Sequence, residues 1–307
     1  GQFDIAHPQA AAVRALARYV ADGTGGACNL LMHGCNSTWA WLAGAVPHRG
    51  PGGSKTAGGA NAQQMLDSAH PAYLLWGIEP EYDCGNPAAA MQVLEQAEAV
   101  IAVASFATDS LRQVADLILP LAPHAEGEGS LMNFDGTTQA FAPAAKAQGE
   151  ARPGWKILRR LGSALGLSGF EQVGLADVQS DLQRAVQGAE QEGAVTVPNL
   201  AAPDTHAGLY RIGEVAMYSV DALCRRAGPL QETQQARSGF VALNPADAER
   251  LGVAEGEPVR VSQGGEPAEL EVEVSERVPA GGVWLRSATC VTRMLGHAVA
   301  PVVVEKA

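Results

Sequence analysis

Four side chains capable of proton transfer lie close together in one irregular, glycine-rich stretch, residues 124–141. They are His124, Glu126, Glu128 and Asp135. A histidine and carboxylates that follow a strand could act as general acid and base at the strand's carboxyl end. A solvated loop is the alternative, because Gly, Asn and Asp are also the usual turn-forming residues. Composition favours the loop, and both interpretations stay open at this point.

Cys28, His33 and Cys35 lie close enough in sequence to suggest a zinc site. Their spacing matches no standard ligand pair, and a fourth ligand would have to come from far away. The apolar run at residues 27–33 predicts a short buried strand, in which Cys28 and His33 point to opposite faces. We therefore predict no metal site, with small buried thiols and a polar loop histidine instead. The five cysteines show no C-x-x-C spacing, so free thiols in a reducing compartment are expected.

Two glycine-rich segments invite comparison with phosphate-binding loops. In residues 50–59 (GPGGSKTAGG), Ser54 stands where a Walker motif needs glycine before the lysine, and the spacing from Gly50 is one residue short. Residues 23–28 (GTGGAC) lack the third glycine of a dinucleotide fingerprint and precede a strand instead of following one. Flexible loops explain both segments. No Gly-x-Ser-x-Gly elbow occurs, so a Ser-His-Asp triad is unsupported.

The elements that must position these residues alternate between strand and helix in the first half of the chain. Apolar runs of strand length occupy residues 73–78, 99–105 and 116–120. Helical signals cover residues 87–98, a short segment from Thr108 or Asp109 to about Ala115, and segments that begin at Pro8 and Pro153. The alternation predicts an α/β domain, with a mostly parallel sheet and helices on both faces, over residues 1–165.

The second half is β-rich. Residues 269–274 (ELEVEV) alternate strictly, so Leu270, Val272 and Val274 share one face. Asn244-Pro245 opens a short capped helix, and further strands are predicted at residues 257–263, 282–286 and 302–304. We expect a linker over residues 166–205, with an amphipathic piece near 175–188, and a small β-barrel or sandwich over residues 206–307.

Charge and hydropathy exclude several classes of function. The chain has 307 residues and a formal net charge of −12, and its scattered Lys and Arg form no face for nucleic acid. No window approaches the roughly 20 apolar residues of a membrane span, so direct membrane insertion is not expected. The chain starts at Gly1 without a signal peptide or initiator Met, which suggests an excised fragment or a cloning remnant. Functional residues upstream of Gly1 are therefore to be expected.

The stretch around the four proton-transfer residues resembles the molybdopterin oxidoreductase superfamily. Residues 115–120 (ADLILP), 126–130 (EGEGS) and Asn133-x-Asp135-Gly136-x-x-Gln139 are similar to the superfamily's patterns ADxxLP, E-x-E-G-[ST] and N-x-[ED]-G-R-x-Q. Residues 245–248 (PADA) and 256–261 (GEPVRV) are similar to its C-terminal double-psi β-barrel domain. The resemblance implies that a pterin pocket would involve Glu126, Gly127, Glu128, Gly129, Asn133 and Asp135.

Within the superfamily, the chain is similar to the G subunits (75 kDa subunits in mitochondria) of NADH–quinone oxidoreductase, respiratory complex I. Residues 34–36 (GCN), 46–48 (VPH), 225–226 (RR) and 230–233 (LQET) carry this similarity. In that family the domain is thought to have lost its cofactor. Thr137 stands where the superfamily has arginine, which removes a cation near a pterin phosphate. The six pocket residues would then be vestigial, with no catalytic residue and no cofactor in this chain.

The resemblance also implies an assembly. The chain would belong to the peripheral arm that passes electrons from NADH to quinone, on the cytoplasmic side of the bacterial inner membrane. Its partners would be other hydrophilic subunits and its own N-terminal region, where cysteine-rich segments would hold iron–sulfur clusters. Two alternatives stay open. One is a fragment of an active molybdopterin-dependent oxidoreductase whose metal ligand lies upstream, and the other is a generic nucleotide-binding module.

Overall fold

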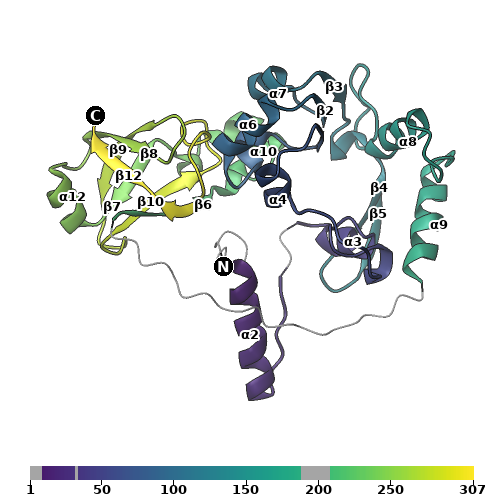
Figure 1. Cartoon of the computed structure of the whole chain (residues 1–307), viewed down its shortest axis with the longest axis horizontal. Coiled ribbons are helices and arrows are strands. Elements are labelled where there is room, and N and C mark those ends of the chain that lie inside the picture. The colour runs from purple at the N-terminus through teal and green to yellow at the C-terminus, as the bar shows by residue number, and fades with distance from the viewer. Residues whose placement is uncertain (1–8, 32–33, 188–207) are drawn as a thin grey trace.

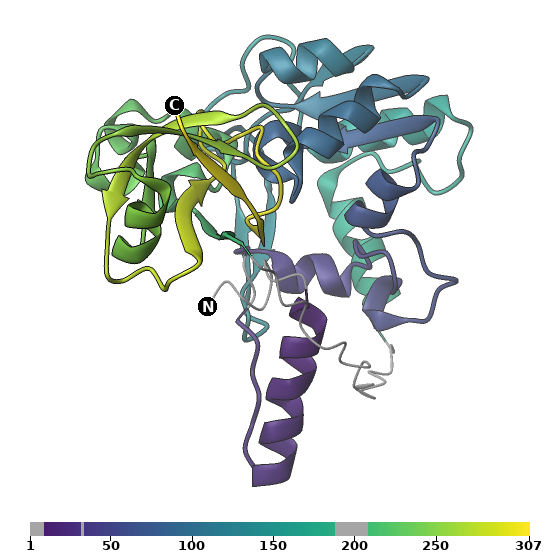
Figure 2. The ribbon, with the colours of Figure 1, turned by 60° about the vertical axis from the view of Figure 1, so that its left-hand side comes forward.

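The structure is a computed structural model that describes residues 9–31, 34–187 and 208–307. An α/β part and a β-rich part lie side by side, and helix α2 (Ala10–Thr24) projects away from both (Figures 1 and 2). No helix in the described ranges combines the length and the apolarity needed to cross a lipid bilayer.

The α/β part is built on a three-stranded parallel sheet. Its strands are β1 (Ala72–Trp76), β2 (Ala99–Ala104) and β3 (Leu117–Pro120), in the order β1-β2-β3. Helices α6 (Pro87–Glu95) and α7 (Asp109–Val114) connect the strands, and side chains from both helices pack with Leu75, Val100 and Ala102 in one core cluster. These elements confirm the predicted strands and helices of this region.

Local capping fixes where the two connecting helices begin. The Asn86 side chain accepts a hydrogen bond from the Ala89 backbone at 3.2 Å, and Pro87 occupies the first turn. Thr108 does the same for α7, accepting from the Leu111 backbone at 3.1 Å, as predicted. Both helices therefore start directly after the loops that leave the carboxyl ends of β1 and β2.

The opposite face of the sheet is covered only in part. Helix α8 (Gly154–Ala164) approaches it so closely that a Cβ on Gly154 would lie 2.9 Å from the Trp76 ring. Farther along, Leu74, Ile101 and Leu117 form a row across the three strands. Leu74 and Leu117 remain 50% and 46% exposed.

Short elements surround the sheet. They are α3 (Ser37–Leu42), α4 (Ala62–Asp67), α5 (Pro80–Asp83), α9 (Leu175–Val186) and the antiparallel hairpin of β4 (Gly129–Met132) and β5 (Thr138–Phe141). The hairpin is tied to α3, because Trp39 Nε1 donates to Ser130 Oγ at 3.1 Å and the Met132 backbone donates to Asn36 at 2.9 Å. Gly136 adopts a left-handed φ of 88° in the Asp-Gly turn between the two strands.

The β-rich part is a seven-stranded curled sheet, in the order β11-β6-β10-β7-β9-β8-β12. Its strands are β6 (Tyr210–Val215), β7 (Phe240–Leu243), β8 (Pro258–Ser262), β9 (Ala268–Val274), β10 (Gly282–Ser287), β11 (Val299–Pro301) and β12 (Val303–Lys306). Helix α12 (Pro245–Leu251) follows β7, with Asn244 as its side-chain cap. The predicted alternation is confirmed, since Leu270 and Val272 are 2% exposed within the core.

Several predictions need correction. Residues 27–31 are irregular and not a strand, and Leu30 and Leu31 are 49% and 70% exposed. A strand requires a hydrogen-bonded neighbour, and this segment returns alongside α2 instead (Figures 1 and 2). Cys35 is accordingly exposed and not buried, while Cys28 is half-buried. His33 lies outside the described residues.

The domain boundaries of the sequence analysis stay predictions. The amphipathic piece expected near residues 175–188 forms helix α9, inside the segment that we assigned to a linker. The C-terminal portion of that segment, residues 188–205, lies outside the described residues. Strands β4, β5, β6, β7 and β11 were not predicted.

A candidate site at the carboxyl edge of the parallel sheet

A cavity of about 380 Å³ lies at the carboxyl ends of the three parallel strands. Residues 77–79 after β1, 104–106 around the end of β2 and 121–124 after β3 line it. Cys35 and residues 221–223 from the β-rich part complete the lining. In open α/β sheets the ligand-binding crevice forms outside the carboxyl ends of the strands, so this cavity is the candidate site.

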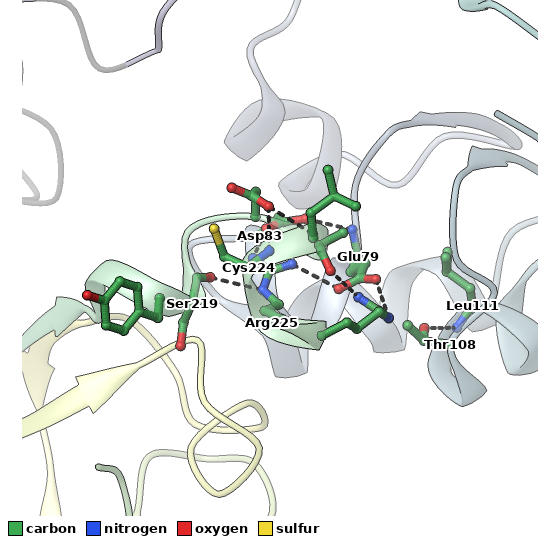
Figure 3. Close-up of polar contacts among 12 residues, drawn as sticks. Glu79, Asp83, Thr108, Leu111, Ser219, Cys224 and Arg225 are labelled. Carbon is green, nitrogen blue, oxygen red and sulfur yellow. Dashed lines mark hydrogen bonds and ion pairs between the residues drawn. The ribbon is translucent and has the colours of Figure 1, made fainter. Parts of the chain in front are cut away.

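Two arginines on helix α10 (Ala222–Arg226) reach across to residues that follow β1. Figure 3 shows Arg225 beside Glu79 and Asp83. Arg225 Nη1 lies 2.9 Å from Glu79 Oε2, and its other terminal nitrogen binds Asp83. Arg226 Nη2 lies 2.6 Å from Glu79 Oε1. We call these four residues, Glu79, Asp83, Arg225 and Arg226, the arginine clamp. It joins the α/β part to the β-rich part directly beside the cavity.

The centre of the clamp is withdrawn from water, while the side chains of Asp83 and Arg226 are 24% and 34% exposed. The side chains of Glu79 and Arg225 are only 3% and 9% exposed. Burial by itself lowers the pKa of Arg225, but hydrogen bonds to Asp83 and Glu79 outweigh it and raise this pKa above its ordinary value. Arg225 is therefore a permanent cation, and its charge is taken up by carboxylates of the same chain.

Aromatic rings and backbone groups fix the position of the two guanidinium groups. Arg225 lies 4.8 Å from the centre of the Tyr82 ring, and Arg226 lies 4.1 Å from that of Phe106. Arg225 Nε also donates to the Ser219 carbonyl at 2.9 Å. The clamp is thus held in a single geometry by contacts with both parts of the fold.

Asp221 sets the start of α10 and lines the cavity. Its Oδ1 accepts hydrogen bonds from the Leu223 and Cys224 backbones, both at 2.8 Å. Burial would raise the pKa of Asp221, but the hydrogen bonds from Cys224 and Leu223 prevail and lower it. Asp221 is therefore ionised at neutral pH. Together with Glu79 it gives the cavity two carboxylates, while no lysine or arginine is among the described lining residues.

The structure separates the residues that the sequence analysis grouped around position 130. His124 lines the cavity, and Glu126 is nearby in sequence, where its Oε2 accepts from the Gln148 backbone at 3.2 Å. Asn133 and Asp135 instead belong to the hairpin turn, and both accept a hydrogen bond from the Thr137 backbone, at 2.9 and 3.0 Å. Hydrogen bonding to Thr137 lowers the pKa of Asp135.

The remaining candidates have packing or solvent roles. Glu128 is exposed, and a Cβ on Gly129 would crowd the Phe141 ring at 3.0 Å. Gly127 links η2 (His124–Glu126) to the hairpin. Within the described ranges, no group of three or more His, Cys, Asp or Glu side chains is placed to hold a metal ion.

Sequence reasoning missed the acidic half of the clamp. Glu79 and Asp83 belong to the run EPEYD, which directly follows the predicted strand at residues 73–78. Charged residues at the carboxyl end of a parallel strand were the available signal. The pair Arg225–Arg226 was noted only as a short basic cluster and as part of the family resemblance.

Comparison with known protein families identifies the fold. Residues 3–164 match the family described as molybdopterin oxidoreductase, and residues 224–293 match the molydopterin dinucleotide binding domain. The chain therefore belongs to the molybdopterin oxidoreductase family, which confirms the resemblance seen in residues 115–139. The second match includes Arg225 and Arg226 of the clamp.

Individual relatives are distant. The chain is 26% identical over 264 residues to the NADPH-Fe(3+) oxidoreductase subunit alpha of Geobacter sulfurreducens, covering 77% of this chain and 30% of that protein. It is 26% identical over 241 residues to the G subunit of the NADH-quinone oxidoreductase of Mycobacterium tuberculosis, covering 75% and 29%. The chain thus spans about a third of the length of these relatives.

Among solved structures, acetylene hydratase from Pelobacter acetylenicus aligns with a TM-score of 0.59 at 14% sequence identity. The alignment covers 89% of this chain and 51% of that structure. At this level of identity the likeness shows a shared fold alone.

Proposed function

We propose that this chain is a structural, cofactor-free region of the G subunit of an NADH–quinone oxidoreductase. In this role it is part of the peripheral arm that carries electrons from NADH to quinone. The observation that carries the proposal is the charge at the carboxyl edge of the sheet, where this fold would hold a dinucleotide cofactor.

The residues at this edge do not fit a pterin dinucleotide. Such a cofactor contains a pyrophosphate, which requires cations or free backbone N–H groups. The cavity instead presents the carboxylates of Glu79 and Asp221. The nearby cations, Arg225 and Arg226, are already paired with Glu79 and Asp83. An incoming pyrophosphate would have to displace a largely buried ion pair and approach the ionised carboxylate of Asp221.

The same contacts support a structural role. Both arginines of the clamp form ion pairs that hold the β-rich part against the α/β part. The carboxyl edge of the sheet is therefore part of a contact between the two parts of the fold. The partners would be neighbouring hydrophilic subunits and the subunit's own N-terminal iron–sulfur region. The location would be peripheral, on the cytoplasmic side of the bacterial inner membrane.

Elemental and pterin analysis of the full-length protein in its complex tests the proposal. We expect iron from the upstream clusters and no stoichiometric molybdenum, tungsten or pterin. A stoichiometric metal–pterin content would establish the alternative, a fragment of an active molybdopterin-dependent oxidoreductase with its metal ligand upstream.

Nucleotide titration tests the lining of the cavity separately. Titration of this chain with ATP, GTP or NAD should show no saturable binding, because the cavity offers carboxylates to a phosphate. Micromolar affinity of the wild-type chain for any of them that is altered by Asp221→Lys would place the nucleotide in the cavity and contradict this account. The matched control is Asp181→Lys, a similar charge reversal on the exposed α9.

A further inference from the structure

A second hollow lies on the outer surface of the β-rich part. Trp284, Ala242 and Glu273 are register neighbours on β10, β7 and β9. The residues beside them in sequence, Val283, Leu243 and Val272, are core residues and at most 2% exposed, so the row faces outward. Ala242 contributes only a methyl group between two large side chains. A cavity of about 560 Å³ forms over this row, and we call it the barrel groove.

The barrel groove is basic in an acidic protein. Three arginines line it, Arg237, Arg277 and Arg286, against a single glutamate, Glu273. The whole chain has a formal net charge of −12, so this local excess of positive charge is opposite in sign to the rest of the molecule. An anionic group is therefore attracted to this place and repelled by most of the remaining surface.

Two of the three guanidinium groups are held in place by rings and carbonyls. Arg237 lies 4.4 Å from the centre of the Phe240 ring, and Arg286 lies 5.9 Å from that of Trp284. Arg286 Nη1 also donates to the carbonyls of Gln235 and Arg237, at 2.5 and 2.6 Å. Little side-chain entropy remains to be lost when a ligand binds these two arginines.

Donor capacity remains unused in the groove. The Nε of Arg286 is buried and has no hydrogen-bond partner. Arg277 is exposed, and within the described part of the chain no hydrogen bond or ion pair is found for its guanidinium. Arg237 shows that a guanidinium group in this groove can bind a carboxylate, because its Nη1 lies 3.1 Å from a carboxylate oxygen of Glu273. Both partners of that pair are well exposed, so a second carboxylate can exchange with it at little cost.

We propose that the barrel groove docks an acidic segment of a partner protein, with carboxylates bound by Arg237, Arg277 and Arg286. Arginine and aromatic residues around a concave patch are the composition of energetically dominant spots in protein interfaces. Because Arg237 already pairs with the carboxylate of Glu273, a partner segment that carries carboxylates is favoured over other anions. The inference rests on the proposed function, in which this chain packs between other proteins.

Fluorescence anisotropy with a labelled peptide of six glutamates tests the groove. The full chain should bind this peptide saturably at low ionic strength, and added salt should weaken the binding because exposed ion pairs are screened. Arg277→Gln should weaken the affinity at least tenfold, since this arginine supports no other described contact. The matched control is Arg260→Gln, which removes the same charge from the exposed pair with Glu269 on β8 and β9 and should leave the affinity unchanged.

Three outcomes would overturn the inference. They are the absence of saturable binding, equal weakening by Arg277→Gln and Arg260→Gln, and binding of inorganic pyrophosphate that depends on Arg277 while the peptide does not bind. Thermal melting of each variant checks that the fold is intact. This test and the metal and pterin analysis can fail independently. If the subunit contains no pterin and also does not bind the peptide, the docking role of the barrel groove is wrong and the proposed function stands.

Discussion

Arg225 and Glu79 are 146 residues apart in sequence, yet their side chains meet at 2.9 Å in an almost fully buried contact. Arg226 binds the second carboxylate oxygen of the same glutamate. The carboxylate of one buried glutamate therefore forms ion pairs with two consecutive arginines of helix α10. The contact connects the α/β part to the β-rich part beside the cavity at the carboxyl ends of the parallel strands.

Loss of Arg225 should destabilise the chain strongly. Arg225→Ala leaves the buried carboxylate of Glu79 with one cation in place of two, and breaking a buried pair costs about 3 kcal/mol. We expect this loss in the free energy of unfolding by urea denaturation. The control is Arg184→Ala, which breaks an exposed pair with Asp181 and should change stability by less than about 0.5 kcal/mol. Equal effects would contradict a structural role for the clamp.

Asp221 should contribute stability that depends on pH. Its folded-state pKa lies below the ordinary value of 3.8, so the folded protein favours the carboxylate. The contribution is complete above pH 3.8 and is lost as the pH falls through the folded-state value. Asp221→Ala should thus cost about 1 kcal/mol at neutral pH, the usual cost of a lost N-cap. Thermal melts across the pH range should show the difference from wild type shrinking only below about pH 4.

Val272 should tolerate no charge. It is 2% exposed inside the β-rich core, and Val272→Asp would bury an unpaired carboxylate there at a cost of several kcal/mol. Circular dichroism should show a large drop in melting temperature or loss of the β signal. Glu271→Asp, on the exposed face of the same strand, is the control. Unchanged melting of the Val272 variant would show that the register of β9 is wrong.

The cysteines should behave as unliganded thiols. Cys28→Ala and Cys35→Ala should each alter stability by no more than about 1–2 kcal/mol, because neither truncates a fully buried side chain. Treatment with a chelator should leave the melting curve unchanged. Chelator-induced unfolding that depends on either cysteine would indicate a metal site that involves residues 28–35.

Cys84 should be the least reactive thiol under mildly alkaline conditions. Burial, together with the charges of Asp83 and Glu81, raises its pKa to about 11. Cys35 and Cys290 are exposed. Mass spectrometry after brief iodoacetamide treatment at about pH 8 should therefore find label on the two exposed cysteines and little on Cys84. Rapid labelling of Cys84 would mean that its surroundings are open to water.

The sequence predicted elements whose signals are local. Strands β1 to β3 are apolar runs with turn residues at their ends, and the Thr108 cap lies three residues from its partner. Strand β7 was missed because its four residues are all buried and therefore show no alternation. The apolar run at residues 27–31 was wrongly predicted to be a strand. The sequence of this run does not show whether a neighbouring strand is present to pair with it.

The candidate site was harder to predict because its residues come from distant segments. His124 was identified from residue type and position after a strand, and the structure places it in the cavity. The clamp depends on the docking of two parts of the fold, which brings positions 79 and 225 together across 146 residues. Local periodicity in the sequence does not indicate a contact between such distant positions. Family resemblance marked Arg225 and Arg226 without indicating what they bind.

Metal and pterin content of the full-length protein, purified in its native complex, tests the central claim most directly. Iron from the iron–sulfur clusters that we propose upstream serves as the internal positive control. A preparation of an established molybdopterin enzyme treated in parallel serves as the external one. We predict iron without stoichiometric molybdenum, tungsten or pterin, because the carboxyl edge carries carboxylates and self-paired arginines. One molybdenum or tungsten per polypeptide, together with a pterin, would contradict the account.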